Sequence, residues 1–118
     1  MSIGIIGIGF VGDAIRRNLI EKGVQVKIYD KFKDGGLGKF ENLLDCKIIF
    51  LCLPTLFIPE RNQYDLDALD QTCAKLAANN YQGLVIIKST VCPGTSEKFV
   101  KQYGLNIIHN PEEVDNRE

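Results

Sequence analysis

Three glycines near the amino terminus have the spacing of a turn that binds a pyrophosphate. They are Gly7, Gly9 and Gly12 of the segment GIGFVG, which lies where an apolar run gives way to apolar residues at helical spacing. In such a motif the first glycine permits a tight turn, the second lets the backbone approach the phosphates, and the third lets the helix pack closely on the strand. Backbone N–H groups and the positive end of the helix dipole then face the phosphate charge. Phe10 and Val11, inside the motif, are expected to contact the same ligand.

An aspartate stands where the ribose of a bound dinucleotide is expected. Asp30 closes the second apolar run, 23 residues after Gly7. A carboxylate there accepts hydrogen bonds from the adenosine ribose hydroxyls and repels a 2′-phosphate, so the pattern favours NAD over NADP. Lys31 beside it weakens this preference without reversing it, and we expect Lys31 to lie at the cofactor. The alternative is that the glycines only turn a strand into a helix and that Asp30 ends a strand in solvent.

Apolar β-branched runs alternate with amphipathic helical ones along the chain, which indicates helices packed on both faces of a mostly parallel sheet. The run Lys47–Leu53 is apolar without alternation, as is typical of a strand covered on both faces. The sequence therefore predicts one α/β domain over residues 1–118, a Rossmann-like, doubly wound sheet of five strands in the order 3-2-1-4-5. The predicted strands are Ser2–Ile8, Val24–Tyr29, Lys47–Leu53, Gly83–Lys88 and Asn106–His109, and the predicted helices are Phe10–Lys22, a short segment near Glu41–Asp45, Asp65–Asn80 and Thr95–Tyr103.

Composition and charge argue against several other classes of protein. The chain has 14 basic and 15 acidic residues, a net charge near −1, and its scattered lysines and arginines argue against a nucleic-acid surface. The longest apolar run, Ile48–Leu53, is far too short to span a membrane, and no export segment is visible, so we expect a cytoplasmic protein. Four cysteines, Cys46, Cys52, Cys73 and Cys92, lack metal-ligand spacing, so we expect them to be reduced, with no metal site.

Three further stretches follow predicted strands, where the carboxyl edge of the sheet opens into the ligand crevice. They are CLPT at residues 52–55, KSTVCPGT at residues 88–95 and HNPEE at residues 109–113. Together with the glycine motif, these stretches resemble the NAD-binding domain of the UDP-glucose/GDP-mannose 6-dehydrogenase family. The resemblance extends over nearly the whole chain, and its STV-x-PGT and NPE segments are more specific than the glycines.

The resemblance implies roles for individual residues. Members of the family oxidise the C6 alcohol of a nucleotide sugar to a carboxylate, in two hydride transfers to NAD. By position, Pro54 and Thr55 are expected to line the cofactor cleft, and Ser89 and Thr90 match the ST pair, which also lies at the cofactor. Thr90 is expected to lie near the reacting water. Glu112, the NPE glutamate, is expected to act in acid–base catalysis, since removing a proton needs a carboxylate or a relay within hydrogen-bond reach. The alternatives are that Pro54 only ends a strand and that Glu112 is a solvated surface acid.

The resemblance also has limits. The family's nucleophilic cysteine, its lysine partner and its sugar-binding surface belong to a central helix and a further domain, which we expect to be absent from this chain. Cys92 replaces a proline of the family's turn, and we do not expect it to take the nucleophile's role. We expect His109 to be packed or solvated and not catalytic. Asn116 and Arg117 stand where the family has a second glutamate and a glycine, which puts the sugar-cradling backbone in doubt.

The sequence therefore predicts a chain that binds NAD but does not by itself oxidise a UDP-sugar. It is either the NAD-binding piece of a dehydrogenase, which binds a nucleotide sugar only when a partner chain completes the site, or a stand-alone NAD-binding module without turnover. A third alternative keeps the sheet but places it in another nicotinamide-dependent family, such as the 6-phosphogluconate or prephenate dehydrogenases. An open sheet edge at the fifth strand favours pairing between copies of the chain.

Overall fold

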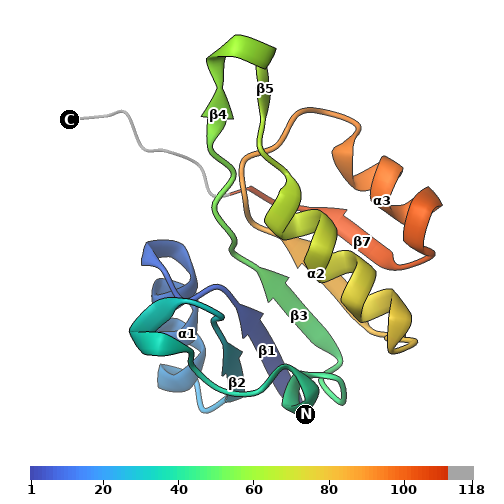
Figure 1. Ribbon diagram of the computed structural model, residues 1–118. Coiled ribbons are helices and arrows are strands. Elements are labelled where there is room, and N and C mark those ends of the chain that lie inside the picture. Colours follow the sequence, from blue (N-terminus) through green and yellow to red (C-terminus); the bar gives the residue numbers. More distant parts are fainter. Residues whose placement is uncertain (112–118) are drawn as a thin grey trace.

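A five-stranded, fully parallel sheet forms the centre of the molecule (Figure 1). The structure is a computed structural model that describes residues 1–111. In spatial order the sheet contains β2 (Gln25–Tyr29), β1 (Ser2–Ile6), β3 (Ile48–Leu51), β6 (Leu84–Ile87) and β7 (Asn106–His109). The register aligns the last residue of each strand with the last residue of its neighbour, so all five carboxyl ends reach one edge. This edge is where a doubly wound sheet places its ligands.

The predicted strand order was wrong. Counted along the chain, the five strands lie in the order 2-1-3-4-5, with β3 next to β1 and not beyond β2. The short helix η2 (Phe40–Leu43) lies over β1 and β2, and a Cβ added to Gly4 of β1 would stand 3.0 Å from the Leu43 side chain. The connection therefore crosses β1 closely and delivers β3 to the far side of that strand. There Ile49 and Leu51, which share one face, are fully buried, whereas Ile48 and Phe50 on the other face are half-buried, so the predicted cover is complete on one face only.

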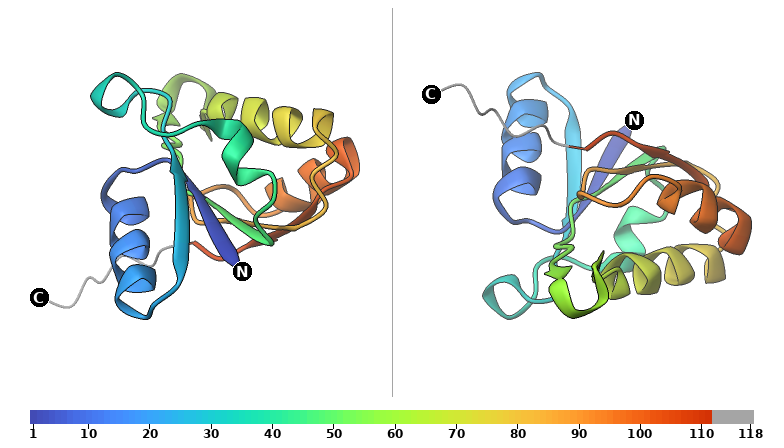
Figure 2. Two further views of the ribbon diagram at one scale, coloured as in Figure 1. Left: turned by 90° about the horizontal axis from the view of Figure 1, so that it is seen from below. Right: turned by 90° about the horizontal axis from the view of Figure 1, so that it is seen from above.

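Helices cover both faces of the sheet, as predicted (Figure 2). On one face, α1 (Phe10–Glu21) packs against β1 and β2. On the other face lie α2 (Asp67–Ala78) and α3 (Thr95–Tyr103), which also contact each other. The predicted bounds of α3 and β7 were correct to the residue, and no end of the other predicted helices and strands is wrong by more than two residues.

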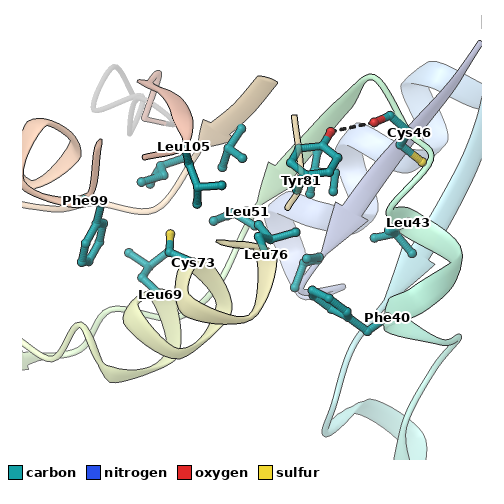
Figure 3. Packing of buried hydrophobic residues seen from close by; sticks show 14 of the residues in the cluster. Phe40, Leu43, Cys46, Leu51, Leu69, Cys73, Leu76, Tyr81, Phe99 and Leu105 are labelled. Atoms are coloured by element: carbon teal, nitrogen blue, oxygen red, sulfur yellow. Dashed lines mark hydrogen bonds between the residues drawn. The ribbon is translucent and has the colours of Figure 1, made fainter. Parts of the chain in front are cut away.

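The main core lies between the sheet and the α2–α3 layer (Figure 3). Leu69, Cys73 and Leu76 of α2 are fully buried there, and Phe99 of α3 packs into the same cluster. At the amino edge of the sheet, the Tyr81 hydroxyl donates a hydrogen bond of 2.7 Å to the backbone carbonyl of Cys46. Burial raises the pKa of Tyr81 to about 12, so the hydroxyl keeps its proton and remains a donor.

A small antiparallel hairpin projects from the carboxyl edge, in a segment predicted to be a loop (Figure 1). It pairs β4 (Phe57–Ile58) with β5 (Gln63–Tyr64), and the rings of Phe57 and Tyr64 meet edge to face at 5.4 Å between centroids. Strands of two residues leave too short an alternation to be recognised in the sequence. Within residues 1–111, no helix has the length and apolar character needed to cross a bilayer.

Candidate cofactor-binding site

A cleft of about 840 Å³ opens at the carboxyl edge of the sheet, where the ends of β1, β2 and β3 meet. The chain runs outward from β1 to β2 on one side and returns to β3 on the other, so the cleft lies at the topological switch point of the sheet. Ile6 is level with Tyr29 of β2 and with Leu51 of β3. Seven of the predicted cofactor residues line this one cleft: Gly7, Gly9, Phe10, Val11, Asp30, Lys31 and Pro54.

Gly7 and Gly12 are required by the fold itself. Gly7 has φ of +95°, and a Cβ there would stand 2.5 Å from the carbonyl oxygen of Cys52. A Cβ on Gly12, which is buried in α1, would stand only 1.9 Å from the Gly7 carbonyl oxygen. These glycines therefore let β1 turn sharply and let α1 pack closely on the turn, whether or not a ligand binds.

Gly9 is different, because the protein itself does not need a glycine there. Its backbone is extended, in a region open to other residues, and an added Cβ would meet nothing within 4 Å. The open space above Gly9 belongs to the cleft. Gly9 is also the N-cap of α1 and provides no side chain to accept hydrogen bonds from the first turn. Those N–H groups are left for an anion in the cleft, which fits a cofactor pyrophosphate.

Asp30 ties the end of β2 to the glycine turn. Its Oδ2 accepts a hydrogen bond of 2.7 Å from the Ile8 N–H, and its Oδ1 accepts bonds from the N–H groups of Phe32 and Lys33 at 2.9 and 3.0 Å. Burial opposes ionisation of this carboxyl group, but the three N–H groups and the Lys33 charge outweigh it. The pKa of Asp30 therefore lies below its usual range.

The direction of this shift predicts how the turn responds to acid. A lowered pKa means that the ionised Asp30 stabilises the folded state fully above the ordinary value of 3.8, and that this contribution is lost as the pH falls through the lower folded value. In an NMR titration, the Ile8 amide proton resonance should follow the ionisation of Asp30, with a midpoint below pH 3.8. In Asp30→Asn the transition should disappear. A transition centred above pH 4 that Asp30→Asn removes would contradict the lowered pKa.

The far wall of the cleft comes from residues that sequence reasoning missed. Ala68, Gln71, Thr72 and Lys75 line it from α2. The Lys75 ammonium lies 4.4 Å from the centroid of the Phe40 ring, an attractive cation–π arrangement. Positions 68, 71, 72 and 75 fall on one helical stripe beside the buried stripe. Their spacing could therefore have indicated that a second face of this helix borders the site.

Thr55, Ser89 and Thr90 lie outside this cleft. They join the carboxyl ends of two strands to each other: the Ser89 hydroxyl donates to the Leu53 carbonyl at 2.5 Å, and the Thr55 hydroxyl donates to the Thr90 carbonyl at 2.6 Å. His109 at the end of β7 is within 2.9 Å of the Ser89 carbonyl through Nε2. The structure thus places these polar residues together, next to the cleft and not in it.

Glu112 and the cysteines complete the comparison with the sequence analysis. Glu112, like Asn116 and Arg117, lies outside the described residues. Cys46 and Cys73 are buried, and burial raises the pKa of Cys73 to about 12, which keeps it a thiol at neutral pH. Cys92 is exposed. Within residues 1–111, the structure contains no group of His, Cys, Asp and Glu side chains arranged to hold a metal ion.

Comparison with solved structures gives close matches in fold. GDP-mannose dehydrogenase from Pseudomonas aeruginosa aligns with a TM-score of 0.79 and 20% identity, over 97% of this chain and 36% of that one. UDP-glucose dehydrogenase from Pyrobaculum islandicum aligns with a TM-score of 0.76 and 21% identity, over 96% and 36% of the two chains. UDP-N-acetyl-mannosamine dehydrogenase from Staphylococcus aureus gives 0.74 and 16%, over 97% and 37%. The chain thus spans little more than a third of these structures.

A family model decides the relationship. No curated protein sequence matches the chain. The model of the UDP-glucose/GDP-mannose dehydrogenase family, NAD-binding domain, matches residues 37–117, which is more than half of the chain. The match begins after the glycine turn and includes the segments at residues 52–55 and 88–95. The chain therefore belongs to the UDP-glucose/GDP-mannose dehydrogenase family, as an NAD-binding domain with the Rossmann-like fold of its solved relatives.

Proposed function

We propose that the cleft at the β1–β3 switch point is the site where this domain holds NAD. The glycine turn and the first N–H groups of α1 bind the pyrophosphate, and Asp30 receives the adenosine ribose beside Lys31. Phe10, Val11 and Pro54 complete the walls near the turn. The observation that carries the proposal is the open space above Gly9, since neither the backbone conformation nor the packing of the protein explains a glycine there.

We further propose that the domain serves the oxidation of a nucleotide sugar at C6. NAD, when bound, accepts hydride from the alcohol carbon. The residues expected nearest to this chemistry are Thr90, close to the reacting water, and Glu112, which would take up a proton. The bonds that Thr55 and Ser89 make to neighbouring strand ends support this placement, because they fix the backbone on both sides of Thr90 at the edge where the strands end.

We propose that the chain alone does not turn over. Members of the family use a nucleophilic cysteine. Cys46 and Cys73 are buried, and the raised pKa of Cys73 leaves that residue little thiolate. The chain also corresponds to only 36% of the GDP-mannose dehydrogenase structure. A nucleotide sugar therefore binds productively only when another segment or chain completes the site.

We also propose a cytoplasmic location. The four cysteines form no disulfide, which fits a reducing compartment.

The test combines calorimetric titration with a turnover assay. The purified chain should bind NAD with a dissociation constant well below a millimolar and should bind NADP more weakly. With NAD and UDP-glucose together, the chain should show no steady formation of NADH. Steady NADH formation would contradict the claim of incompetence, whereas binding without turnover fits both a dehydrogenase piece and a stand-alone module. Absence of NAD binding would overturn the assignment of the cleft.

We also propose that copies of the chain associate through β7. In the described part of the chain β7 pairs with β6 alone and stands at one end of the sheet order. Ile108 on this strand is 47% exposed, which leaves an apolar side chain on a strand whose outer edge has no partner in the described sheet. Light scattering should show a mass that rises with concentration, and a mass that stays monomeric at high concentration would contradict association.

A further inference from the structure

The backbone of Ile8, the residue between the first two glycines of the turn, is held from outside through both its N–H and its carbonyl group. The N–H of Ile8 donates to Asp30, and the carbonyl of Ile8 accepts a hydrogen bond of 2.8 Å from the Lys33 ammonium group. Both partners belong to the segment that follows β2, more than twenty residues along the chain. Because Ile8 is flanked by Gly7 and Gly9, which restrict the backbone least, these external bonds fix the orientation of the two peptide groups on either side of Ile8.

The same lysine adds positive charge to the phosphate end of the cleft. Lys33 lines the cleft together with Gly9, and its charge is close enough to help lower the pKa of both Asp13 and Asp30. Asp13, in the first turn of α1, is already paired with Arg16 at 2.5 Å and with Arg17 at 2.9 Å. Lys33 is therefore not needed to neutralise Asp13, and its charge adds to the positive end of the helix dipole.

We propose that Lys33 is a cofactor-positioning residue. Its ammonium group holds the Ile8 carbonyl, keeps the glycine turn in the shape that receives the pyrophosphate of NAD, and attracts the phosphate charge to the cleft. The inference rests on the proposed function, since it takes the pyrophosphate to lie at the glycine turn. Lys33 was not among the residues predicted from the sequence, because a lysine in a polar, glycine-rich loop has no recognisable spacing to the motif.

The experiment compares three variants by calorimetric titration with NAD and with ADP. Lys33→Ala removes both the bond to Ile8 and the charge, and Lys33→Arg keeps a cation that can donate to the same carbonyl. Lys47→Ala is the matched control, because Lys47 is exposed at the opposite, amino edge of the sheet and its loss changes the net charge equally. Unfolding of each variant is followed in urea, so that loss of binding is separated from loss of fold.

Lys33→Ala should bind NAD and ADP about tenfold more weakly, which is the effect expected for one charge-assisted hydrogen bond. Its affinity should also depend less steeply on salt than that of the wild type, because one cation facing the phosphates is gone. Lys33→Arg should recover most of the affinity, and Lys47→Ala should keep all of it. Lys33→Ala loses a bond within the protein and should unfold at a somewhat lower urea concentration than the control, but it should remain fully folded under the conditions of the titration.

Two results would overturn the inference while leaving the proposed function intact. One is that Lys33→Ala binds NAD as tightly as the wild type. The other is that Lys33→Ala and Lys47→Ala lose affinity equally, since the effect would then reflect net charge alone. If the wild-type chain itself binds no NAD, the proposed function fails, and the inference fails with it. The wild-type titration therefore distinguishes the two failures.

Discussion

A Gly9→Val variant should fold as the wild type does and lose NAD binding. The extended backbone at this position accepts a side chain, and a new Cβ meets no protein atom within 4 Å. The valine methyl groups would instead occupy the part of the cleft where the first N–H groups of α1 are exposed. We expect NAD affinity to fall by about 100-fold, because forcing extra methyl groups into a contact surface costs on the order of 3 kcal/mol.

This test contrasts a large effect on NAD affinity with a small effect on folding stability. Of the eleven glycines, all of them within residues 1–111, Gly9 alone combines an ordinary backbone conformation with open space around its missing side chain. Replacing it should leave the urea unfolding midpoint close to that of the wild type, because the lower entropy of the unfolded chain is opposed by the loss of a favourable N-cap residue. Gly9→Ala, with a single methyl group, should have a smaller effect on binding. Undiminished NAD affinity in Gly9→Val would place the pyrophosphate elsewhere.

The fold class could be predicted because its signals are local. Apolar runs of the right length alternate with helical stripes, and α3 is bounded by Gly94 and Gly104, whose positive φ angles mark its two ends. The strand order could not be predicted in the same way, since it depends on the path of a connection. Only packing shows that η2 crosses directly over Gly4 and so delivers β3 to the far side of β1.

The candidate site could be predicted in part, for a related reason. Gly7, Gly9 and Asp30 meet in one cleft because they follow or end adjacent parallel strands, a consequence of the fold class. Lys33 reaches the same cleft from the short 3-10 helix η1 (Lys33–Gly35) and Lys75 from one face of α2, and their positions depend on tertiary packing. Thr90 was placed by resemblance and lies at the same edge but outside the cleft, so its part in the chemistry remains a prediction.

Gly12→Ala, in contrast to Gly9→Val, should mainly lower the stability of the fold. A Cβ at position 12 would lie 1.9 Å from the Gly7 carbonyl oxygen and 3.0 Å from its carbon, both of them backbone atoms that no rotamer change can move away. To relieve the clash α1 must shift off β1, which breaks the contacts that cover this face of the sheet. We expect destabilisation of about 3 kcal/mol or more, a large part of the roughly 5–15 kcal/mol that stabilises a typical domain. Urea denaturation measures the loss, with Gly9→Ala as the control of equal size change. An unchanged midpoint in Gly12→Ala would mean that α1 does not approach the turn this closely.

The same variant separates the packing role of Gly12 from any role at the cofactor. A ligand that binds only the folded state stabilises that state. If the shifted turn still binds NAD, saturating NAD should therefore recover part of the lost stability of Gly12→Ala.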